Sequence, residues 1–348
     1  MGKNVFTGFR KTETTMNYAI GIDISDQTFT VSCVTPTFQR IFVSRTFAQS
    51  QEGWDQLLTL CDDYRLPKDR LFVIMEATGV YSERISHYLH QHGLAVFVEP
   101  PGKIHHAFYE RGKTDPVDSR QIAEYGFRFD DQLHTWQPKT EILDQIQTLL
   151  ATREQFTSMM TACKNARHGL SRKHYRIESA LLLYGELSKD IETRIDRIDR
   201  EIHHILATNC FLCHIAQNIQ SIPNIGFLLT VNLLVVTDGF TRHLNHTQLA
   251  SYMGICPFEY QSGTSIHRRP RSDGAGPARL RKLIYLTAMR LRRNHPAFRA
   301  YFERKVAEGK PKRLILNNIS NHALKLICGV IRSGKPYIKN YRSLPPHL

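Results

Sequence analysis

Apolar and polar positions along the first third of the chain follow a pattern typical of a mixed α/β domain. Strands are predicted where β-branched and aromatic residues gather, at 18–23, 28–34, 40–46 and 95–98. A continuous apolar run at 71–75 predicts a central strand that is covered on both faces. Helical spacing is found at 54–64 and again after the fourth strand, to about residue 92. We therefore predict a sheet with helices between its later strands.

The predicted order is three strands, helix, strand, helix, strand, helix, which is the order of the RNase H fold. We place this domain at residues 17–136, after an N-terminal extension at 1–16 in which Met16 is an alternative start. The first strand ends in Asp23 and the fourth ends in Glu76. In that fold the ends of these two strands and the start of a late helix converge on one site.

Asp115 and Asp118 open the predicted late helix, with Pro116 between them. Proline is favoured at the first helical position because its missing N–H is unpaired there in any case. This spacing makes Asp115 the N-cap and Asp118 the third helical residue, so both carboxylates lie on one face of the helix. Two carboxylates held so close repel each other unless a cation lies between them.

The four acids have a structural and a chemical interpretation. Singly, each could cap a turn or a helix, or end a strand in solvent. Together they occupy the four positions at which the fold builds a metal site, and hard divalent cations prefer carboxylate oxygens. Two metal ions about 4 Å apart can hold the attacking and leaving oxygens of a phosphoryl transfer. We predict two Mg²⁺ or Mn²⁺ ions held by Asp23, Glu76, Asp115 and Asp118.

From about residue 140 the pattern becomes that of long helices, and we assign 137–215 to a coiled-coil arm. Apolar residues recur in steps of three and four, at Ile142, Ile146, Leu149, Phe156, Met160, Cys163, Leu187, Ile191, Ile195, Ile198, Ile202 and Ile205. Gly169 and Gly185 predict a break between two helices. The arm is either a dimerisation element or a helical hairpin that packs on its own chain.

Positive charge is concentrated in the last third of the chain. The whole chain carries a net charge of +14, and the fifteen Lys and Arg and four Asp and Glu at 259–313 contribute +11 of it. Interleaved aromatic residues fit contacts to a nucleic-acid backbone, although a solvated helix face has a similar composition. The candidate nucleic-acid contacts are Lys113, Arg268, Arg269, Arg271, Arg279, Arg281, Lys282, Arg290, Arg292 and Arg293.

Composition excludes several classes of protein. The apolar content of 41% is that of a globular chain. The first 15 residues do not read as a signal peptide, and the apolar run at 227–236 is too short to span a bilayer. The seven cysteines have no framework spacing, which indicates reduced thiols. We expect a cytoplasmic, nucleoid-associated bacterial protein with no membrane partner.

Several motifs of this chain together resemble the insertion sequence one-ten family of DEDD recombinases, which includes the Piv-type DNA invertases. In the first third they are GIDIS from Gly21, EATGVY from Glu76 and KTDPVDSRQIAE from Lys113. In the last third they are SIPNIG from Ser221, ASYMGICPFEYQSGTS from Ala250 and LRKLIYLTAM from Leu280. The resemblance extends from about residue 18 to 337, and the middle helices match only in character.

The resemblance implies an α/β plus α architecture: a RuvC-like domain, a coiled coil and a mostly helical C-terminal transposase domain, here 216–340 before a tail at 341–348. It implies the four acids as the metal-binding tetrad. It also implies Ser262, in a small, hydroxyl-rich segment that we expect to be flexible, as the nucleophile that links covalently to DNA. The implied partners are donor and target DNA, a structured bridge RNA, and further copies of the chain in a dimer or tetramer.

Two departures from the family pattern and three alternative functions remain. Gly274 stands where many members carry lysine, and Asn321-His322 replaces a usual basic pair. A Piv-type invertase would need no guide RNA, and a RuvC-like nuclease would use the same tetrad with water. A catalytically idle nucleic-acid-binding protein would not require the intact tetrad.

Overall fold

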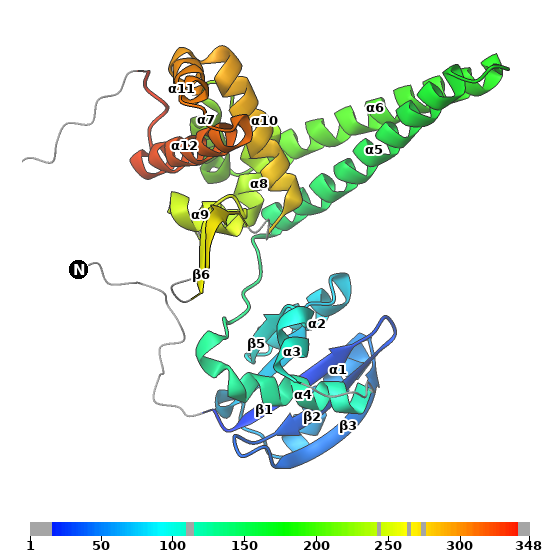
Figure 1. Cartoon of the computed structure of the whole chain (residues 1–348). Coiled ribbons are helices and arrows are strands. Elements are labelled where there is room, and N and C mark those ends of the chain that lie inside the picture. Colours follow the sequence, from blue (N-terminus) through cyan, green and yellow to red (C-terminus); the bar gives the residue numbers. More distant parts are fainter. Residues whose placement is uncertain (1–15, 109–114, 242–244, 263–265, 273–275, 340–348) are drawn as a thin grey trace, which may run out of the picture. The chain divides into compact units, whose positions relative to one another are not determined.

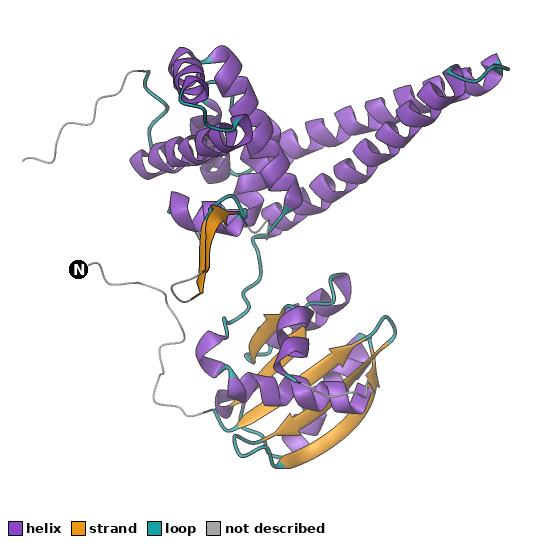
Figure 2. Ribbon diagram, in the orientation of Figure 1, coloured by secondary structure: helices purple, strands orange, loops and turns teal. Residues whose placement is uncertain are grey.

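The computed structural model describes residues 16–108, 115–241, 245–262, 266–272 and 276–339, and of residues 115–117, 258–262 and 266–271 it describes the backbone alone. The chain divides into two compact units, Met1–Pro138 and Lys139–Leu348. The first unit contains the five-stranded sheet, whereas the second is helical apart from one β-hairpin (Figures 1 and 2). The predicted extension and tail lie almost entirely outside the described residues, and the three-domain division stays a prediction.

The first unit has the predicted order of elements. Its strands are β1 (Tyr18–Ile24), β2 (Thr28–Val34), β3 (Arg40–Ala48), β4 (Leu71–Glu76) and β5 (Ala95–Glu99). Its helices are α1 (Gln51–Asp63), α2 (Val80–Gln91), α3 (Pro101–Ala107) and α4 (Asp115–Arg128), with short 3₁₀ turns at Lys68–Arg70 and Asp130–Gln132. The sheet order is β3-β2-β1-β4-β5, in which β2 is antiparallel to both β1 and β3, and β4 is parallel to both β1 and β5. Helix α3 is an addition to the predicted order.

Alternate residues of each strand supply the two cores of this unit, one on each face of the sheet. Ile20 and Ile22 of β1 pack in a cluster with residues of α1 and α2, such as Leu57 and Leu89. Ala19 of β1 belongs instead to a cluster with residues of α3 and α4. Helices α1 and α2 therefore cover one face, and α3 and α4 cover the other (Figure 1).

Gly21 allows α4 to lie directly against β1. A Cβ atom at Gly21 would lie 2.1 Å from the backbone oxygen of Ser119 and 2.3 Å from the backbone nitrogen of Ala123. Both atoms belong to backbone, which cannot rotate away as a side chain could. The buried hydroxyl of Ser119 is also hydrogen-bonded to that of Ser32 on β2, at 2.9 Å. The early turns of α4 are thus fixed over β1 and β2.

The long helices of the second unit, α5 (Glu141–Ser171) and α6 (Glu178–Ala207), lie side by side as a hairpin of one chain (Figure 1). The hairpin turns at 172–177, between Gly169 and Gly185, which confirms the predicted break between two helices. Gly185 lies within α6, near the Arg167 side chain of α5. Ile191, Ile195, Ile198 and Ile202 of the predicted seam are buried, whereas Leu187 is exposed.

The remaining helices form the core of the second unit together with the base of the hairpin. They are α7 (Cys210–Gln220), α8 (Phe227–Thr237), α9 (His246–Tyr252), α10 (Ala278–Asn294), α11 (Pro296–Ala307) and α12 (Lys312–Ser333). Among the described residues, α12 is the one helix that is long and apolar enough to cross a bilayer, and half of that apolar stretch is buried inside the protein. Ile319, Ala323 and Ile327 of α12 lie in the core, which accounts for its composition.

Candidate active site and nucleic-acid interface

Asp23 and Glu76 lie on the same face and at the same end of two neighbouring strands. Strands β1 and β4 are parallel with Ile22 opposite Met75, so one step further places Asp23 beside Glu76. On β1, Asp23 falls in the same alternation as Ala19 and Gly21, which face α4. Both carboxylates therefore lie on the sheet face covered by α4, at the carboxyl ends of their strands. The side chains of both residues are partly buried and have interactions with other groups.

The start of α4 brings the second pair of predicted acids toward these strand ends. Helix α4 begins at Asp115 itself, one residue earlier than the predicted N-cap assignment. Asp118 is partly buried and directly precedes Ser119, whose backbone oxygen lies against Gly21, two residues before Asp23. The side chain of Asp115 lies outside the described residues. Because Asp115 and Asp118 are three apart in one helix, they share a face of α4.

His105 contacts Glu76 and was not among the predicted site residues. Its Nε2 atom lies 3.8 Å from Oε1 of Glu76, whose side chain is 14% exposed. His105 is on α3 (Pro101–Ala107), a helix that the sequence pattern did not predict, so no sequence signal placed it near Glu76.

Glu99 is a further acid at this end of the sheet that sequence reasoning missed. It is opposite Glu76 in the parallel register of β4 and β5, and it is 4% exposed. Lys103 of α3 donates a 2.8 Å hydrogen bond to its carboxylate, and this bond raises the pKa of Lys103. The strand predicted at 95–98 is followed directly by Glu99, which was the available signal. Lys103 thus compensates the charge of Glu99.

The donor set fits a hard divalent cation, since all four predicted ligands are carboxylates. Among the side chains that the structure describes, however, no three of His, Cys, Asp and Glu are grouped so that they could hold a metal ion. Asp23, Glu76 and Asp118 are among the described side chains and do not form such a group, and the side chain of Asp115 lies outside the description. The metal site therefore stays a prediction, supported by the shared position of Asp23 and Glu76.

Ser262 is the last residue of a β-strand, and the expected flexibility of the segment around it stays a prediction. Strand β6 (Phe258–Ser262) pairs antiparallel with β7 (Ile266–Arg271), and Ser262 is opposite Ile266. Pairing with β7 fixes the backbone of Ser262 at the end of the hairpin. The side chain of Ser262 lies outside the described residues, and its role as nucleophile stays a prediction.

The predicted nucleic-acid contacts on α10 differ in what they already bind. Arg279 donates to the backbone oxygen of Leu150 at 2.6 Å and lies 3.7 Å from a carboxylate oxygen of Glu154. Arg281 donates to the backbone oxygen of Gly276 at 2.7 Å. Arg292 lies 4.0 Å over the ring of Phe302. These three arginines make intramolecular contacts, which leaves fewer free donors for a phosphate.

The other predicted cations are exposed or lie outside the description. Lys282, Arg290 and Arg293 on α10 are exposed to solvent. The side chains of the three arginines on β7 and the whole of Lys113 lie outside the described residues; the β7 residues are Arg268, Arg269 and Arg271. Of the described cations, the exposed ones on α10 are the strongest candidates for phosphate contacts.

Two protein-family models match this chain. A family model described as Transposase, of the DEDD type of IS110, matches residues 20–174, and one described as Transposase IS116/IS110/IS902 family matches residues 216–303. The chain belongs to the IS110 family of transposases. The first match covers β1 to α5 with all four predicted acids, and the second covers Ser262 and α10. An IS110-family member is a DNA-processing enzyme.

Curated relatives of this IS110-family chain are of two kinds. The pilin gene-inverting proteins of Moraxella lacunata and Moraxella bovis are 29% and 28% identical over 330 residues, which is 92% of this chain and 97% of each relative. An insertion element IS110 protein of 43.6 kDa from Streptomyces coelicolor is 30% identical over 119 residues, 34% of this chain and 29% of that protein. The inverting proteins thus match over nearly their full length.

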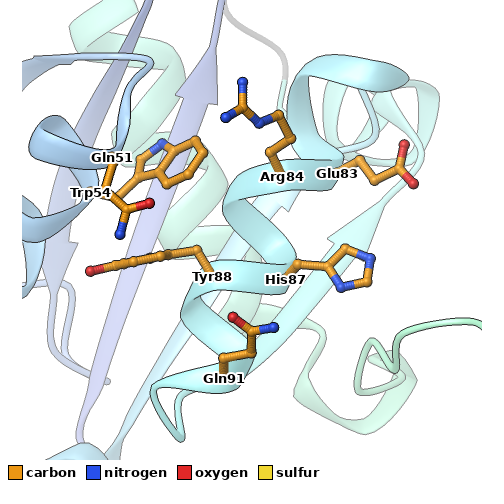
Figure 3. Close-up of a pocket in the computed structure, with 7 residues that line it drawn as sticks. All are labelled: Gln51, Trp54, Glu83, Arg84, His87, Tyr88 and Gln91. Atoms are coloured by element: carbon orange, nitrogen blue, oxygen red, sulfur yellow. The ribbon is translucent and has the colours of Figure 1, made fainter. Parts of the chain in front are cut away.

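One groove of the IS110-family chain lies apart from the predicted acids. Figure 3 shows this groove, of about 320 Å³, along α1 and α2, which cover the opposite face of the sheet. The guanidinium of Arg84 lies 5.3 Å over the ring of Trp54, whose other neighbour in the groove is Tyr88. Glu83 also lines the groove. The groove contains none of the predicted site residues.

Proposed function

We propose that this protein is a site-specific DNA recombinase that cleaves and rejoins DNA strands through Ser262, with the four acids as its metal-binding site. The observation that carries the proposal is the placement of Asp23 and Glu76 on one sheet face, with α4 fixed over β1 by Gly21. The sheet order β3-β2-β1-β4-β5 supports a RuvC-like domain of the RNase H fold. Membership of the IS110 family supports DNA as the substrate.

The acids supply negative charge at one end of the sheet, and α4 directs its positive N-terminal end to the same place. Asp23, Glu76, Asp115 and Asp118 would hold the divalent ions. When bound, such ions provide Lewis-acid stabilisation of charge on a phosphate and lower the pKa of a coordinated hydroxyl. Glu99 does not join this set, because its carboxylate is already hydrogen-bonded to Lys103.

In the proposed reaction the Ser262 hydroxyl oxygen attacks a DNA phosphorus. A bond from this oxygen to phosphorus forms as the hydroxyl loses its proton, and the phosphorus bond to one deoxyribose oxygen breaks. That oxygen takes up one proton to become a hydroxyl, so the number of protons is unchanged. One phosphodiester replaces another, so a hydroxyl of a second strand can reverse the step and reseal the DNA without ATP. A serine hydroxyl is a weak nucleophile unless its proton is removed or its pKa is lowered.

Two biological forms of this reaction are compatible with the site. Transposition of an insertion sequence is the form that the family name supports, and we propose a bridge RNA as its guide. Inversion of a DNA segment without a guide is favoured by one observation, the near full-length match to the two pilin gene-inverting proteins. Either form acts on chromosomal DNA, so we propose a cytoplasmic, nucleoid-associated protein.

The α5–α6 hairpin supports assembly with another copy of the chain. At and beyond its turn it exposes large apolar side chains, namely Tyr175, Ile177, Leu182, Leu183 and Leu187. Solvent exposure of so many large apolar groups within thirteen residues is typical of an interaction surface. We propose that this end of the hairpin contacts a second copy in a dimer or tetramer.

The test uses the full chain, Mg²⁺ and a plasmid that carries the genomic DNA flanking the gene for this protein. We expect Ser262→Ala to remove both recombinant junctions and covalent protein–DNA adduct, because no other group supplies the linking oxygen. The control Ser265→Ala, three residues away, should keep both activities. Mass spectrometry of the wild-type adduct should locate the nucleotide on Ser262.

The same preparation separates the competing functions. Sequencing of nucleic acid that copurifies with the protein should give one structured RNA for the transposase, and none for the invertase. DNA cleavage that persists in Ser262→Ala without any adduct would establish a water-using nuclease and contradict the proposed mechanism. A nucleotide attached to any other residue would contradict the assignment of Ser262.

A further inference from the structure

A cavity of about 480 Å³ lies within the second unit, beside the start of the β6–β7 hairpin. Its volume falls in the range of pockets that hold a small organic group. It is lined by residues of α5, α8, α9 and α10 and by residues that flank these helices: Lys139, Gln147, Leu150, Ala151, Asn232, Val235, Val236, Asp238, Tyr252, Pro277 and Arg279. Most of these residues have no part in the site proposed above.

The cavity combines apolar walls with hydrogen-bond acceptors. Leu150 and Ala151 contribute apolar atoms from α5, and Val235 and Val236 contribute them from α8. Asn232 is 7% exposed, and its amide nitrogen donates to the backbone oxygen of Leu228 at 2.6 Å. This bond engages the amide nitrogen of Asn232, which lines the cavity. Apolar surfaces with a few oriented polar groups are what a planar heteroaromatic ring requires.

Two further polar groups and two cations line the same space. Asp238, the left-handed C-cap of α8, contributes a carboxylate. Burial raises the pKa of Tyr252, so its hydroxyl stays protonated. Lys139 supplies positive charge suited to a phosphate attached to the bound ring, whereas the guanidinium of Arg279 at the same wall already donates to the backbone oxygen of Leu150. Acceptors and cations together fit a nucleotide whose base carries an amino group.

The cavity wall is in contact with the chain that returns from the β6–β7 hairpin, and this hairpin carries Ser262. A Cβ atom at Gly276 would lie 1.9 Å from the backbone oxygen of Tyr252, so the chain that returns from the hairpin is held against a residue of the cavity wall. From Phe258 to Ser262, β6 extends four residue steps, roughly 13 Å. A stacked strand advances about 3.4 Å per nucleotide, so this length corresponds to about four nucleotides.

We propose that this cavity receives one unpaired nucleobase that carries an exocyclic amino group, from the nucleic acid that the recombinase processes. The base is displaced from its stack and lies between the apolar groups of α5 and α8, as in proteins that extrude a base. Its amino group donates to the amide oxygen of Asn232 and the carboxylate of Asp238. A thymine or uracil, which presents carbonyl oxygens and no amino group, is disfavoured. This inference rests on the proposed function in that it takes nucleic acid as the substrate.

The test measures binding of the full chain to 5′-fluorescein 12-mers by fluorescence anisotropy. The probes are oligo(dA), oligo(dT), oligo(rA) and an abasic deoxyribose-phosphate strand of equal length. We expect oligo(dA) or oligo(rA) to bind roughly tenfold more tightly than the abasic strand, because one stacked base typically contributes about that much to affinity. The same strand should also bind more tightly than oligo(dT). Tighter binding of oligo(dA) would identify DNA as the source of the base, and tighter binding of oligo(rA) would identify RNA.

The variant Ala151→Trp places an indole in the cavity from an exposed position of α5. We expect it to abolish the difference between base-bearing and abasic strands and to leave the salt dependence of binding unchanged. The matched control Ala162→Trp, at an exposed position three turns further along α5, should keep that difference. An undiminished preference in Ala151→Trp would overturn the inference, and so would a wild-type protein that does not distinguish oligo(dA) and oligo(rA) from the abasic strand.

Ser262→Ala separates this inference from the proposed reaction. It should lose strand exchange and keep the preference for base-bearing strands. Loss of exchange in Ala151→Trp with a normal adduct at Ser262 would further support a role for the cavity in positioning the strand. Strand exchange by Ser262→Ala, together with a preserved base preference, would contradict the reaction alone.

Discussion

Gly21→Ala tests whether close packing of α4 on β1 places the acids, without changing any acid. The new methyl group would lie 2.1 Å from the Ser119 oxygen and 2.3 Å from the Ala123 nitrogen, both in the backbone of α4. Helix α4 must therefore move away from the sheet. Overpacking of this kind costs about 1–3 kcal/mol, and loss of the buried Ser32–Ser119 hydrogen bond adds about 1 kcal/mol. Reduced flexibility of the unfolded chain returns about 0.4–1 kcal/mol.

We expect a net loss of roughly 2–3 kcal/mol in the unfolding free energy of the first unit. Both tryptophans of the chain, Trp54 and Trp136, belong to this unit, so tryptophan fluorescence in urea reports its unfolding alone. With a urea dependence of about 1–3 kcal/mol per molar, the midpoint should fall by about 1–2 M. The matched control is Gly102→Ala on α3, where an added Cβ meets nothing within 4 Å, and its midpoint should stay or rise slightly.

Strand exchange measured at a temperature where Gly21→Ala is still folded completes the test. Displacement of Asp115 and Asp118 by about 1 Å should lower the exchange rate roughly 100-fold, while nucleic-acid binding through the second unit persists. An unchanged urea midpoint would refute the packing argument. A lowered midpoint with full exchange activity would show that the position of α4 does not matter for the reaction.

Two further predictions concern the surface charge and the buried thiols. The double variant Lys282→Gln, Arg293→Gln should lower the slope of log affinity against log salt concentration by about two, because each phosphate contact contributes about 0.9 to it. The control double variant Lys189→Gln, Lys325→Gln should leave this slope unchanged. An equal effect of both double variants would show that the α10 cations face solvent and do not contact phosphate. Burial raises the pKa of Cys33 and of Cys61 from about 9 to about 12. Their contribution to stability is thus complete below about pH 9 and is lost as the pH rises toward 12. Iodoacetamide at pH 8.5, followed by mass spectrometry, should label exposed Cys210 and spare Cys33 and Cys61, and equal labelling rates would contradict their burial.

The sequence alone determined the order of elements in the first unit and the two strand ends that carry Asp23 and Glu76. Strands β1, β2 and β4 lie within one residue of their predicted bounds, because a buried strand needs a run of apolar residues and a strand end admits a carboxylate. The pair at Asp115 and Asp118 was also recognisable, since a proline between two acids indicates a helix start. These features depend on neighbours in the chain, which a single sequence contains.

Contacts between distant segments were decided only by the tertiary structure. His105 and Glu99 flank Glu76 because α3 follows β5 at the same end of the sheet, and short α3 has too few apolar residues to give a helical pattern. The structural role of a glycine also depends on distant contacts. Gly185 lies inside a helix, whereas at Gly21 the backbone of α4 leaves no room for a Cβ atom. Likewise, Arg279 and Arg281 resemble Lys282 and Arg293 in sequence, but their guanidinium groups bind backbone carbonyls. Which cations face solvent depends on which carbonyl groups the fold brings near them, and local spacing does not encode that.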